Sequence, residues 1–390
     1  MRKKISILGA SGSVGMQALD VALSRGYEID ILSASTSVDK MERAVRAHSP
    51  RYVHLDSPRA AEELKVKIAD TSTKVVSGDL SDLILNDCRS DTVVNAISGY
   101  HGLAPTLAVI EKGARLALAN KESLVIAGDI VMSRARERGV EILPVDSEHS
   151  AIFQSLRAGR REEISRILLT ASGGPFYGKS REEVRYVTKD EVLLHPTWKM
   201  GKKITVDSAT LMNKGFEIIE ACHLFGVPEN KIEVLIHRES ILHSAVEYID
   251  KAVIGQMSVP DMRECVQYAV DYPERLPSAI ERLDLFKIGS LTFAKPDKEA
   301  FPLLALASRA MADGGAYGAV LESADERAVE AYLSDKITFG DISDVVSCVY
   351  DRASFAKYAS SLEEILSAHK EAAIIADEII VKKSKNDARS

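Results

Sequence analysis

Short apolar runs alternate with helical patterns over the first third of the chain, and this alternation constrains the fold more than any other feature. Strands are predicted at residues 5–8, 30–33, 52–55, 74–76, 92–96, 115–117 and 141–144. Strands that alternate with helices form parallel sheets joined by crossover helices. The sequence therefore predicts an α/β fold, with a Rossmann-like doubly wound sheet over residues 1–145.

A glycine-rich turn at residues 9–15 (Gly-Ala-Ser-Gly-Ser-Val-Gly) follows the first predicted strand and opens a helix. Glycines let the backbone approach a pyrophosphate, whose charge a helix N-terminus favours. The alternative is a plain strand-to-helix turn. The carboxylate that usually binds a ribose 2′-OH is missing after the second strand, where residues 35–37 read Ser-Thr-Ser and Asp30 lies too early. This pattern favours NADP over NAD, with Lys40 or Arg43 as the nearby cation.

Polar residues cluster after two later strands of the same region. The segment 120–123 (Asn-Lys-Glu-Ser) is either a ligand-binding loop or a capped helix start. Asp146 and Glu148 lie two apart, so an extended backbone would point both carboxylates the same way. Such oxygen ligands suit Mg²⁺ or Mn²⁺. The alternative is a solvated helix start, with Asp146 as the N-cap and Glu148 in the first turn.

Residues 146–285 read as a central α+β domain. Strands are predicted at 166–170, 203–206, 233–236, 244–248 and 253–257, the last three as an antiparallel meander. A helix is expected to open after 203–206, and on it Asn213 and Glu217 would share a face beside Lys214. That helix start is a candidate phosphate cradle, with Glu217 completing a metal site. A small-residue loop at 170–175 follows another strand, and residues 195–201 around Trp198 read as a flap over a ligand or as a segment with a buried tryptophan.

The remaining sequence predicts a linker over residues 286–312 and a helical domain over 313–390, with helices at 323–333, 342–353 and 361–383. The chain has 390 residues, a formal net charge of −7 and no basic cluster, which argues against nucleic acid as a main partner. No window approaches the roughly 18 apolar residues of a membrane span, so no membrane association is expected. Four cysteines without a C-x-x-C pair predict reduced thiols and a cytoplasmic location.

Taken together, these motifs resemble the 1-deoxy-D-xylulose 5-phosphate reductoisomerase family. The matching stretches run in the family's order over the whole chain, at residues 9–15, 120–125, 144–154, 169–176, 195–201, 206–220 and 237–272. The resemblance implies an oxidoreductase and isomerase that uses NADPH and a divalent ion (Mg²⁺, Mn²⁺ or Co²⁺). Such an enzyme is expected to convert a phosphorylated sugar, 1-deoxy-D-xylulose 5-phosphate, to 2-C-methyl-D-erythritol 4-phosphate in non-mevalonate isoprenoid biosynthesis. A homodimer is implied, with the strands of residues 233–257 as the expected interface.

The resemblance also implies roles for individual residues. The implied metal ligands are Asp146, Glu148 and Glu217. The implied substrate contacts are Ser147, Ser172, His195, Ser208, Asn213 and Lys214, with Trp198 and Met200 in the flap and Lys121 between substrate and nicotinamide. The implied cofactor contacts are Gly9, Ser11, Gly12, Ser13, Val14, Gly15, Asn120, Glu122 and Gly201. His243 matches a histidine important for activity, and His149 either does the same or orders the carboxylate loop.

One departure concerns the second strand, where the family commonly has a Gly-Lys-Asn-type turn and this chain has Ser-Thr-Ser at 35–37. The cation expected beside a 2′-phosphate is absent from that turn. The rival interpretations are another NADP-dependent oxidoreductase, which would reduce its substrate without rearranging carbon, and a non-catalytic NADP-binding sensor, which needs no metal ligands.

Overall fold

The computed structural model describes residues 3–194 and 201–387. The chain divides into two compact units. The first unit comprises Met1–Ser123, Val131–Ser150 and Asp261–Arg282, and the second comprises Leu124–Ile130, Ala151–Pro260 and Leu283–Ser390. The division into cofactor, central and C-terminal domains at residues 145, 285 and 312 stays a prediction.

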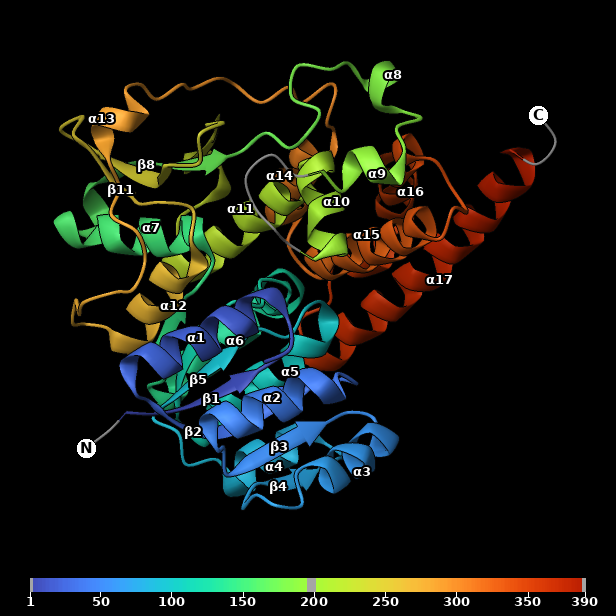
Figure 1. The fold of residues 1–390 in the computed structure, drawn as a ribbon. Helices are drawn as coiled ribbons and strands as arrows, with labels where there is room; N and C mark the ends of the chain where they lie inside the picture. Colours follow the sequence, from blue (N-terminus) through green and yellow to red (C-terminus); the bar gives the residue numbers. More distant parts are fainter. Residues whose placement is uncertain (1–2, 195–200, 388–390) are drawn as a thin grey trace. The chain divides into compact units, whose positions relative to one another are not determined.

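A seven-stranded parallel sheet forms the core of the first unit (Figure 1), in the order β4-β3-β2-β1-β5-β6-β7. The order runs outward from the centre in both directions, which is the doubly wound pattern predicted. The apolar runs of the inner strands are buried on both faces of this sheet, as parallel sheets require, whereas the edge strand β4 is partly exposed. The strands are β1 Lys4–Leu8, β2 Glu28–Ala34, β3 Tyr52–Leu55, β4 Lys74–Val76, β5 Thr92–Asn95, β6 Arg115–Leu118 and β7 Ile142–Pro144.

Helices connect these strands and cover the sheet. They are α1 Ser13–Arg25, α2 Val38–His48, α3 Pro58–Lys67, α4 Leu80–Asp87, α5 Leu103–Lys112 and α6 Glu122–Arg138. Helix α7 Ser147–Ser155 follows the last strand, β7, and a later helix, α12 Met262–Asp271, packs against α1. Several begin at side chains that accept a backbone N–H, such as Ser57 before α3 and Asp79 before α4. Short 3₁₀ turns lie at Tyr100–Gly102, Leu156–Ala158, Arg161–Glu163, Glu229–Lys231 and Ser354–Ala356.

The second unit contains a four-stranded mixed sheet in the order β11-β10-β8-β9. Its strands are β8 Ile164–Ala171, β9 Ile232–Ile236, β10 Leu242–Tyr248 and β11 Val253–Met257. The predicted meander is wrong for its first strand, because β9 pairs in parallel with β8 rather than with β10. Only β10 and β11 pair as antiparallel neighbours in sequence. The sequence pattern located the strands. It did not reveal that β8, which ends about 60 residues before β9 begins, lies between β9 and β10 in the sheet.

The described part of the second unit also contains the helices α8 Arg181–Val184, α9 Lys189–Val192, α10 Lys202–Thr210, α11 Met212–Phe225, α13 Leu285–Ile288, α14 Leu303–Asp313, α15 Tyr317–Leu333, α16 Phe339–Arg352 and α17 Leu362–Asp387. The predicted strand at 203–206 is wrong, because these residues belong to α10. Helix α10 packs on α11 and α15, and this tertiary packing overrides the strand preference of Thr205 and Val206. Helix α14 occupies the end of the predicted linker.

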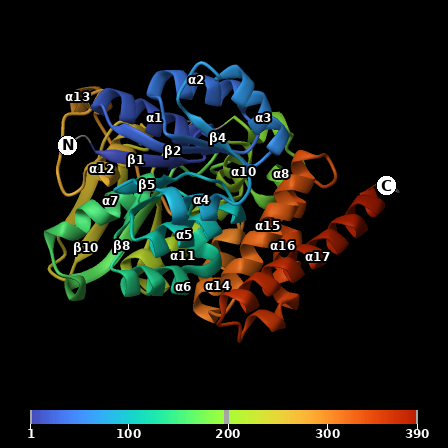
Figure 2. The same cartoon turned by 90° about the horizontal axis from the view of Figure 1, so that it is seen from below.

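Helices α15, α16 and α17 pack against one another (Figures 1 and 2), which confirms the predicted C-terminal helical bundle. Small and branched side chains fill its interior, among them Ala324, Ala328 and Val345 at 0% exposure. Among the described helices, none is both long enough and apolar enough to span a membrane.

Candidate functional site

The glycine turn after β1 is closed by backbone contacts that exclude side chains. Gly9 has φ +76°, and a Cβ atom there would lie 2.5 Å from the Ala96 carbonyl oxygen. A Cβ atom on Gly15 would lie 2.2 Å from the Gly9 carbonyl oxygen. Both positions therefore require glycine, so that α1 can start directly against the strand end.

The start of α1 is open to solvent. Gly12 is its N-cap and offers no side-chain cap, and both Gly12 and Ser13 are exposed. The first N–H groups of a helix need partners, and an anionic group satisfies them and suits the helix dipole. The predicted binding of a phosphate at this end of α1 stays a prediction, and the exposed N–H groups leave room for it.

The end of β2 holds the glycine turn from the side. The Ser33 hydroxyl accepts the Gly9 N–H at 3.1 Å, and its carbonyl accepts the Ala10 N–H at 2.7 Å. Lys40 donates to the Ser11 carbonyl at 2.9 Å, so one of the two cations considered beside the Ser-Thr-Ser turn reaches the glycine loop. Asp30 is buried and accepts from Arg51 at 2.7 Å, in line with its placement inside the strand.

Asn120, at the end of β6, is a buried hydrogen-bonding centre. Its amide nitrogen lies 2.7 Å from the Ile97 carbonyl, 2.9 Å from the Gly99 carbonyl and 2.9 Å from a Glu122 carboxylate oxygen. Its amide oxygen accepts the Ser123 N–H at 3.0 Å. The side chain of Asn120 thus fixes the loops around the strand end rather than projecting from them.

Lys121 and Asp146, predicted from separate motifs of the first unit, form an ion pair of 2.5 Å. Both side chains are largely buried, at 7% and 12% exposure. The carboxyl ends of β6 and β7, which are neighbours in the sheet, bring the two residues together. A buried pair of this kind holds a cationic group at the edge of the sheet where open α/β folds place ligands.

The backbone at Asp146 and Glu148 differs from the extended segment predicted. Helix α7 begins at Ser147, so Asp146 precedes the helix and Glu148 lies in its first turn, as in the alternative interpretation. The Ser147 hydroxyl donates to the Glu148 carboxylate at 2.5 Å. His149 is fully buried. Burial raises the pKa of the nearby Cys265 thiol, with Glu264 and Asp146 adding to the effect, so Cys265 stays protonated.

In the second unit, the loop after β8 contacts the end of α10. Gly173 and Gly174 have φ +79° and +65°, and a Cβ atom on Gly174 would lie 2.7 Å from the Ser208 carbonyl oxygen. The Ser172 hydroxyl accepts the Gly174 N–H at 3.4 Å. Two predicted phosphate contacts, Ser172 and Ser208, are therefore brought to neighbouring positions by the absence of a side chain at Gly174.

Leu211 joins α10 to α11 in a left-handed conformation with φ +59°. This conformation costs a leucine roughly 1–2 kcal/mol, and such backbone strain is typical of functional sites. The junction places Ser208 in the last turn of α10 and Lys214 in the first turn of α11.

Glu217 lies one turn further along α11 and is 1% exposed. Lys214 contacts one of its carboxylate oxygens at 2.5 Å, and the Asn213 amide donates to the other at 2.6 Å. Lys214 is itself buried at 4% exposure. The shared helix face predicted for Asn213 and Glu217 is confirmed, and it carries a buried cluster of one cation, one amide and one carboxylate.

His243 lies on β10, beside the end of β8. Its Nε2 atom is 2.9 Å from the Ser258 hydroxyl, and its carbonyl accepts the Thr170 hydroxyl at 2.8 Å. The predicted residues His195, Trp198 and Met200 lie outside the described part of the chain. Gly201 is the exposed N-cap of α10.

Two residues of the second unit were missed by the sequence interpretation. Arg238 donates to the Gly174 carbonyl at 2.8 Å and so braces the loop that carries Ser172. Lys203 contacts Asp207 at 2.7 Å and Asp325 of α15 at 2.6 Å. The i,i+4 spacing of Lys203 and Asp207 was the available signal, but it has meaning only on a helix, and the sequence had been interpreted there as a strand.

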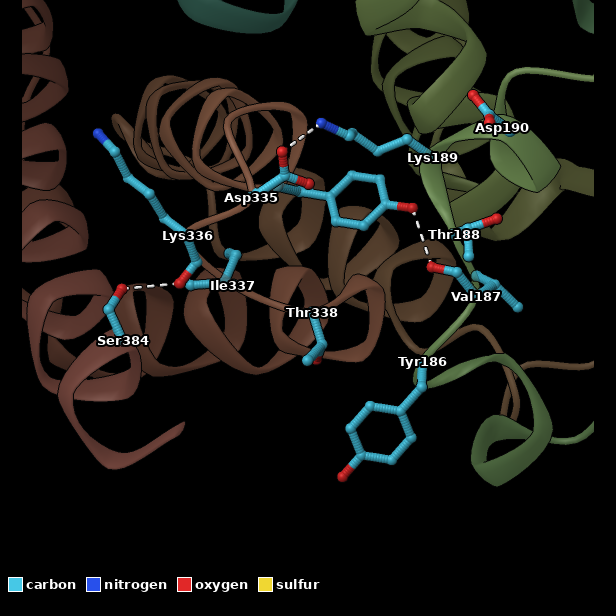
Figure 3. A pocket seen from close by; sticks show the side chains of 11 residues that line it. Tyr186, Val187, Thr188, Lys189, Asp190, Asp335, Lys336, Ile337, Thr338 and Ser384 are labelled. Atoms are coloured by element: carbon cyan, nitrogen blue, oxygen red, sulfur yellow. Dashed lines mark hydrogen bonds and ion pairs between the residues drawn. The ribbon is translucent and has the colours of Figure 1, made fainter. Parts of the chain in front are cut away.

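A separate hollow of about 670 Å³ opens between the segment after α8 and the turn after α15 (Figure 3). Lys189 and Asp335 form an ion pair across it at 2.5 Å, and the Tyr332 hydroxyl donates to the Val187 carbonyl at 3.1 Å. None of the predicted site residues described in the structure lines this hollow.

Three family models match this chain. Residues 5–128 match 1-deoxy-D-xylulose 5-phosphate reductoisomerase, residues 142–225 match its C-terminal domain, and residues 257–374 match the model described as DXP reductoisomerase C-terminal domain.

Curated relatives and solved structures agree with these models. The 1-deoxy-D-xylulose 5-phosphate reductoisomerase of Acetivibrio thermocellus is 47% identical over 97% of this chain and 100% of its own length. That of Chlorobium phaeobacteroides is 47% identical over 94% and 96%. Two solved structures are similar at 39% identity and a TM-score of 0.89 over 97% of this chain. They are the reductoisomerase of Zymomonas mobilis with NADPH, covered to 99%, and a DOX-P reductoisomerase with NADPH, fosmidomycin and magnesium, covered to 98%. The chain belongs to the 1-deoxy-D-xylulose 5-phosphate reductoisomerase family.

Proposed function

We propose that this chain converts 1-deoxy-D-xylulose 5-phosphate to 2-C-methyl-D-erythritol 4-phosphate, with NADPH and a divalent metal ion, in non-mevalonate isoprenoid biosynthesis. The observation that carries this proposal is 47% identity to a family member over 97% of the chain, combined with paired buried charges at the motif positions. A sensor that only binds NADP does not need the buried Glu217–Lys214 pair. A simple dehydrogenase does not need the carboxylates that are proposed below as metal ligands.

Asp146, Glu148 and Glu217 are the proposed metal ligands. All three offer hard oxygen atoms, which fit Mg²⁺ or Mn²⁺. Glu217 is preoriented by Lys214 and Asn213, and Glu148 by Ser147, so both carboxylates are held before a ligand arrives. When bound, the divalent ion supplies Lewis-acid polarisation of the substrate ketone.

The phosphate of the substrate is proposed to bind at the α10–α11 junction, on Ser172, Ser208, Asn213 and Lys214. The buried ammonium of Lys214 provides the charge, and the two serines lie on either side of the Gly174 contact. Binding energy from this remote group serves to orient the reacting carbons and to close the site. Ser147, His195, Trp198 and Met200 complete the proposed substrate contacts.

Lys121 is proposed to stabilise a developing oxyanion as a point charge. Its ion pair with Asp146 fixes its position. His243 is proposed as a positioning residue at the β8–β10 edge, where it contacts Ser258.

The cofactor is proposed to bind at the carboxyl ends of the first unit's strands, and when bound NADPH supplies the hydride that reduces the rearranged aldehyde. Its pyrophosphate would lie on the open start of α1, against the N–H groups of Ser13 and Val14. Gly9, Gly12 and Gly15 provide the close approach, and Ser11, Asn120, Glu122 and Gly201 complete the proposed contacts. Because the Asn120 side chain is occupied within the fold, its contact with the cofactor would use backbone atoms.

A homodimer through the four-stranded sheet is also proposed. Strand β11 is an edge strand, and Val253, Ile254 and Met257 on it are 51%, 39% and 42% exposed. An apolar edge strand is a natural pairing surface. We expect Ile254→Lys to shift the mass measured by analytical ultracentrifugation towards the monomer. An unchanged dimer would place the interface elsewhere.

The four free cysteines, three of them buried, are in line with the proposed cytoplasmic location.

The decisive test is a product assay. The purified chain is incubated with 1-deoxy-D-xylulose 5-phosphate, NADPH and Mg²⁺, and the product is identified by NMR. We expect NADPH oxidation that requires the metal, with a product whose carbon skeleton is branched. Reduction without rearrangement would indicate a simple dehydrogenase. NADPH binding without turnover would indicate a sensor.

A further inference from the structure

The C-terminal bundle contains a second group of potential metal ligands that the proposed reaction does not use. Glu322 and Glu326 lie one turn apart on α15, and His369 faces them from α17. One ligand atom from each of the three lies within 4.8 Å of the other two. Residues four apart on a helix share a face, and facing helices of a bundle are a recurrent place for metal sites.

Glu322 is fully buried, and only one of its two carboxylate oxygens has a hydrogen-bond partner. Its Oε2 atom lies 2.7 Å from the Nε2 atom of His369. Its Oε1 atom is buried and has no hydrogen-bond partner. A buried carboxylate oxygen left unpaired costs about 1–3 kcal/mol or more, so a ligand that reached this oxygen would be stabilised by it.

The charges around Glu322 do not balance. The cation that faces it from α10 is Lys203, which is already paired with Asp207 and Asp325. Arg327 on α15 is committed to Glu330 and Asp377. Burial raises the pKa of Glu322, and His369 and Lys203 oppose this rise only in part. Among the described residues, four carboxylates (Asp207, Glu322, Asp325 and Glu326) thus lie near one lysine and one histidine in this group. Buried carboxylates in such a group are neutralised either by a proton or by a bound cation.

The ligand types indicate which cation fits. Two carboxylates and an imidazole suit Zn²⁺ and related transition metals, which accept nitrogen ligands; with three protein ligands, a water would take the fourth tetrahedral position. Mg²⁺ prefers an all-oxygen environment and retains its water. The chemistry of this group therefore differs from that of the all-carboxylate set proposed for catalysis.

We propose that Glu322, Glu326 and His369 form a second divalent-metal site of the zinc class, which ties α15 to α17. The metal replaces the proton shared between Glu322 and His369 and takes up the free oxygen of Glu322. Its role is structural, because it joins two helices of the bundle that are about 45 residues apart in sequence.

The test measures metal content and stability rather than activity. The full chain is stripped with a chelator, incubated with Zn²⁺ in the presence of excess Mg²⁺ to occupy the catalytic carboxylates, and freed of unbound metal by gel filtration. We expect the wild type to retain a single equivalent of zinc by mass spectrometry of the metal, and its thermal midpoint to rise on zinc addition. Glu217→Gln should retain this zinc, because it alters only the catalytic set.

Glu322→Gln and His369→Gln should each lose the zinc and its effect on the thermal midpoint. Glu330→Gln, an exposed change on the same helix, is the matched control and should behave as wild type. If either buried variant does not fold, the half-buried Glu326→Gln replaces it. A wild type that retains no zinc, or ligand variants that retain as much as wild type, would overturn the proposal, and Glu322 and His369 would then be a buried ion pair only.

Discussion

The glycine turn after β1 and the α10–α11 junction are both proposed to bind phosphate groups, but they are built in opposite ways. The turn presents backbone N–H groups at an exposed helix start, and its shape depends on positions where no side chain fits. The junction presents buried side chains, with Lys214 and Glu217 at 4% and 1% exposure. The turn is recognised from one contiguous motif, whereas the function of a buried charge can be judged only from the residues that pack around it.

The same contrast explains where interpretation of the sequence succeeded. The glycines, the strand and the helix of the first region are contiguous, and the turn was located from them alone. The α10–α11 junction depends on Lys203 of α10, whose partner Asp325 lies more than 120 residues later in the sequence. Residues 203–206 were accordingly assigned to the wrong element. The predictions below test whether substitutions near the α10–α11 junction have larger effects on stability and activity than substitutions in the glycine turn.

The largest expected effect is on stability and follows removal of Lys203. Lys203→Met leaves Asp207 and Asp325, at 4% and 0% side-chain exposure, without their shared cation. Breaking a buried ion pair costs about 3–5 kcal/mol. Urea unfolding followed by circular dichroism should show this loss. Lys202→Met, at the exposed neighbouring position, is the control and should change stability little. Equal stability of the two variants would mean that the buried network does not hold α10.

The next effect is on turnover. Glu217→Gln keeps the shape of the side chain but removes the charge that Lys214 contacts and that the proposed metal requires. We expect turnover to fall by at least ~10², with NADPH binding largely intact. Steady-state kinetics at several Mg²⁺ concentrations and a fluorescence titration with NADPH measure the two quantities. Near-normal activity at limiting Mg²⁺ would refute the metal assignment. Glu378→Gln on α17 serves as an exposed control.

A smaller effect is expected in the glycine turn. Alanine favours a helix over glycine by about 1 kcal/mol, so propensity alone predicts that Gly15→Ala stabilises α1. The new Cβ atom would lie 2.2 Å from the Gly9 carbonyl oxygen, and overpacking of this kind costs about 1–3 kcal/mol. We expect a net loss of stability together with weaker NADPH binding. Gly12→Ala, whose Cβ would meet that same oxygen at 3.3 Å, should have the milder effect. The reverse order would show that the close contact at Gly15 is not what shapes the turn.

The smallest effect concerns Lys40, which is exposed and contacts the Ser11 carbonyl. If Lys40 is the cation for the 2′-phosphate, Lys40→Met should weaken NADPH binding by less than about tenfold, as expected for a solvent-screened charge. The affinity for NADH should not change. Isothermal titration with both cofactors distinguishes the two roles. Equal weakening of both would mean that Lys40 only braces the loop. Arg43→Met provides the comparison for the other candidate cation.

Much of the site was predictable because its residues lie in short motifs with a defined meaning. Asn213, Lys214 and Glu217 share a helix face through their spacing, and Gly9–Gly15 form a turn through theirs. What was not predictable depended on distant partners. Asp146 and Glu148 fit an extended strand end as well as a helix start, and only the position of α7 decides between the two. Arg238 carries no motif at all, and its contact with the Gly174 carbonyl is visible only when β8 and β9 are paired.

The sequence by itself determined the parallel sheet, the glycine turn, the family and the identity of the charged residues, because periodicity and contiguous motifs are encoded over a few residues. Tertiary structure decided which strand pairs with β8, that residues 202–210 are a helix, and which buried carboxylate faces which cation. The physical reason is that burying a charge is favourable only with a specific partner, and in this chain those partners are supplied by segments far apart in sequence.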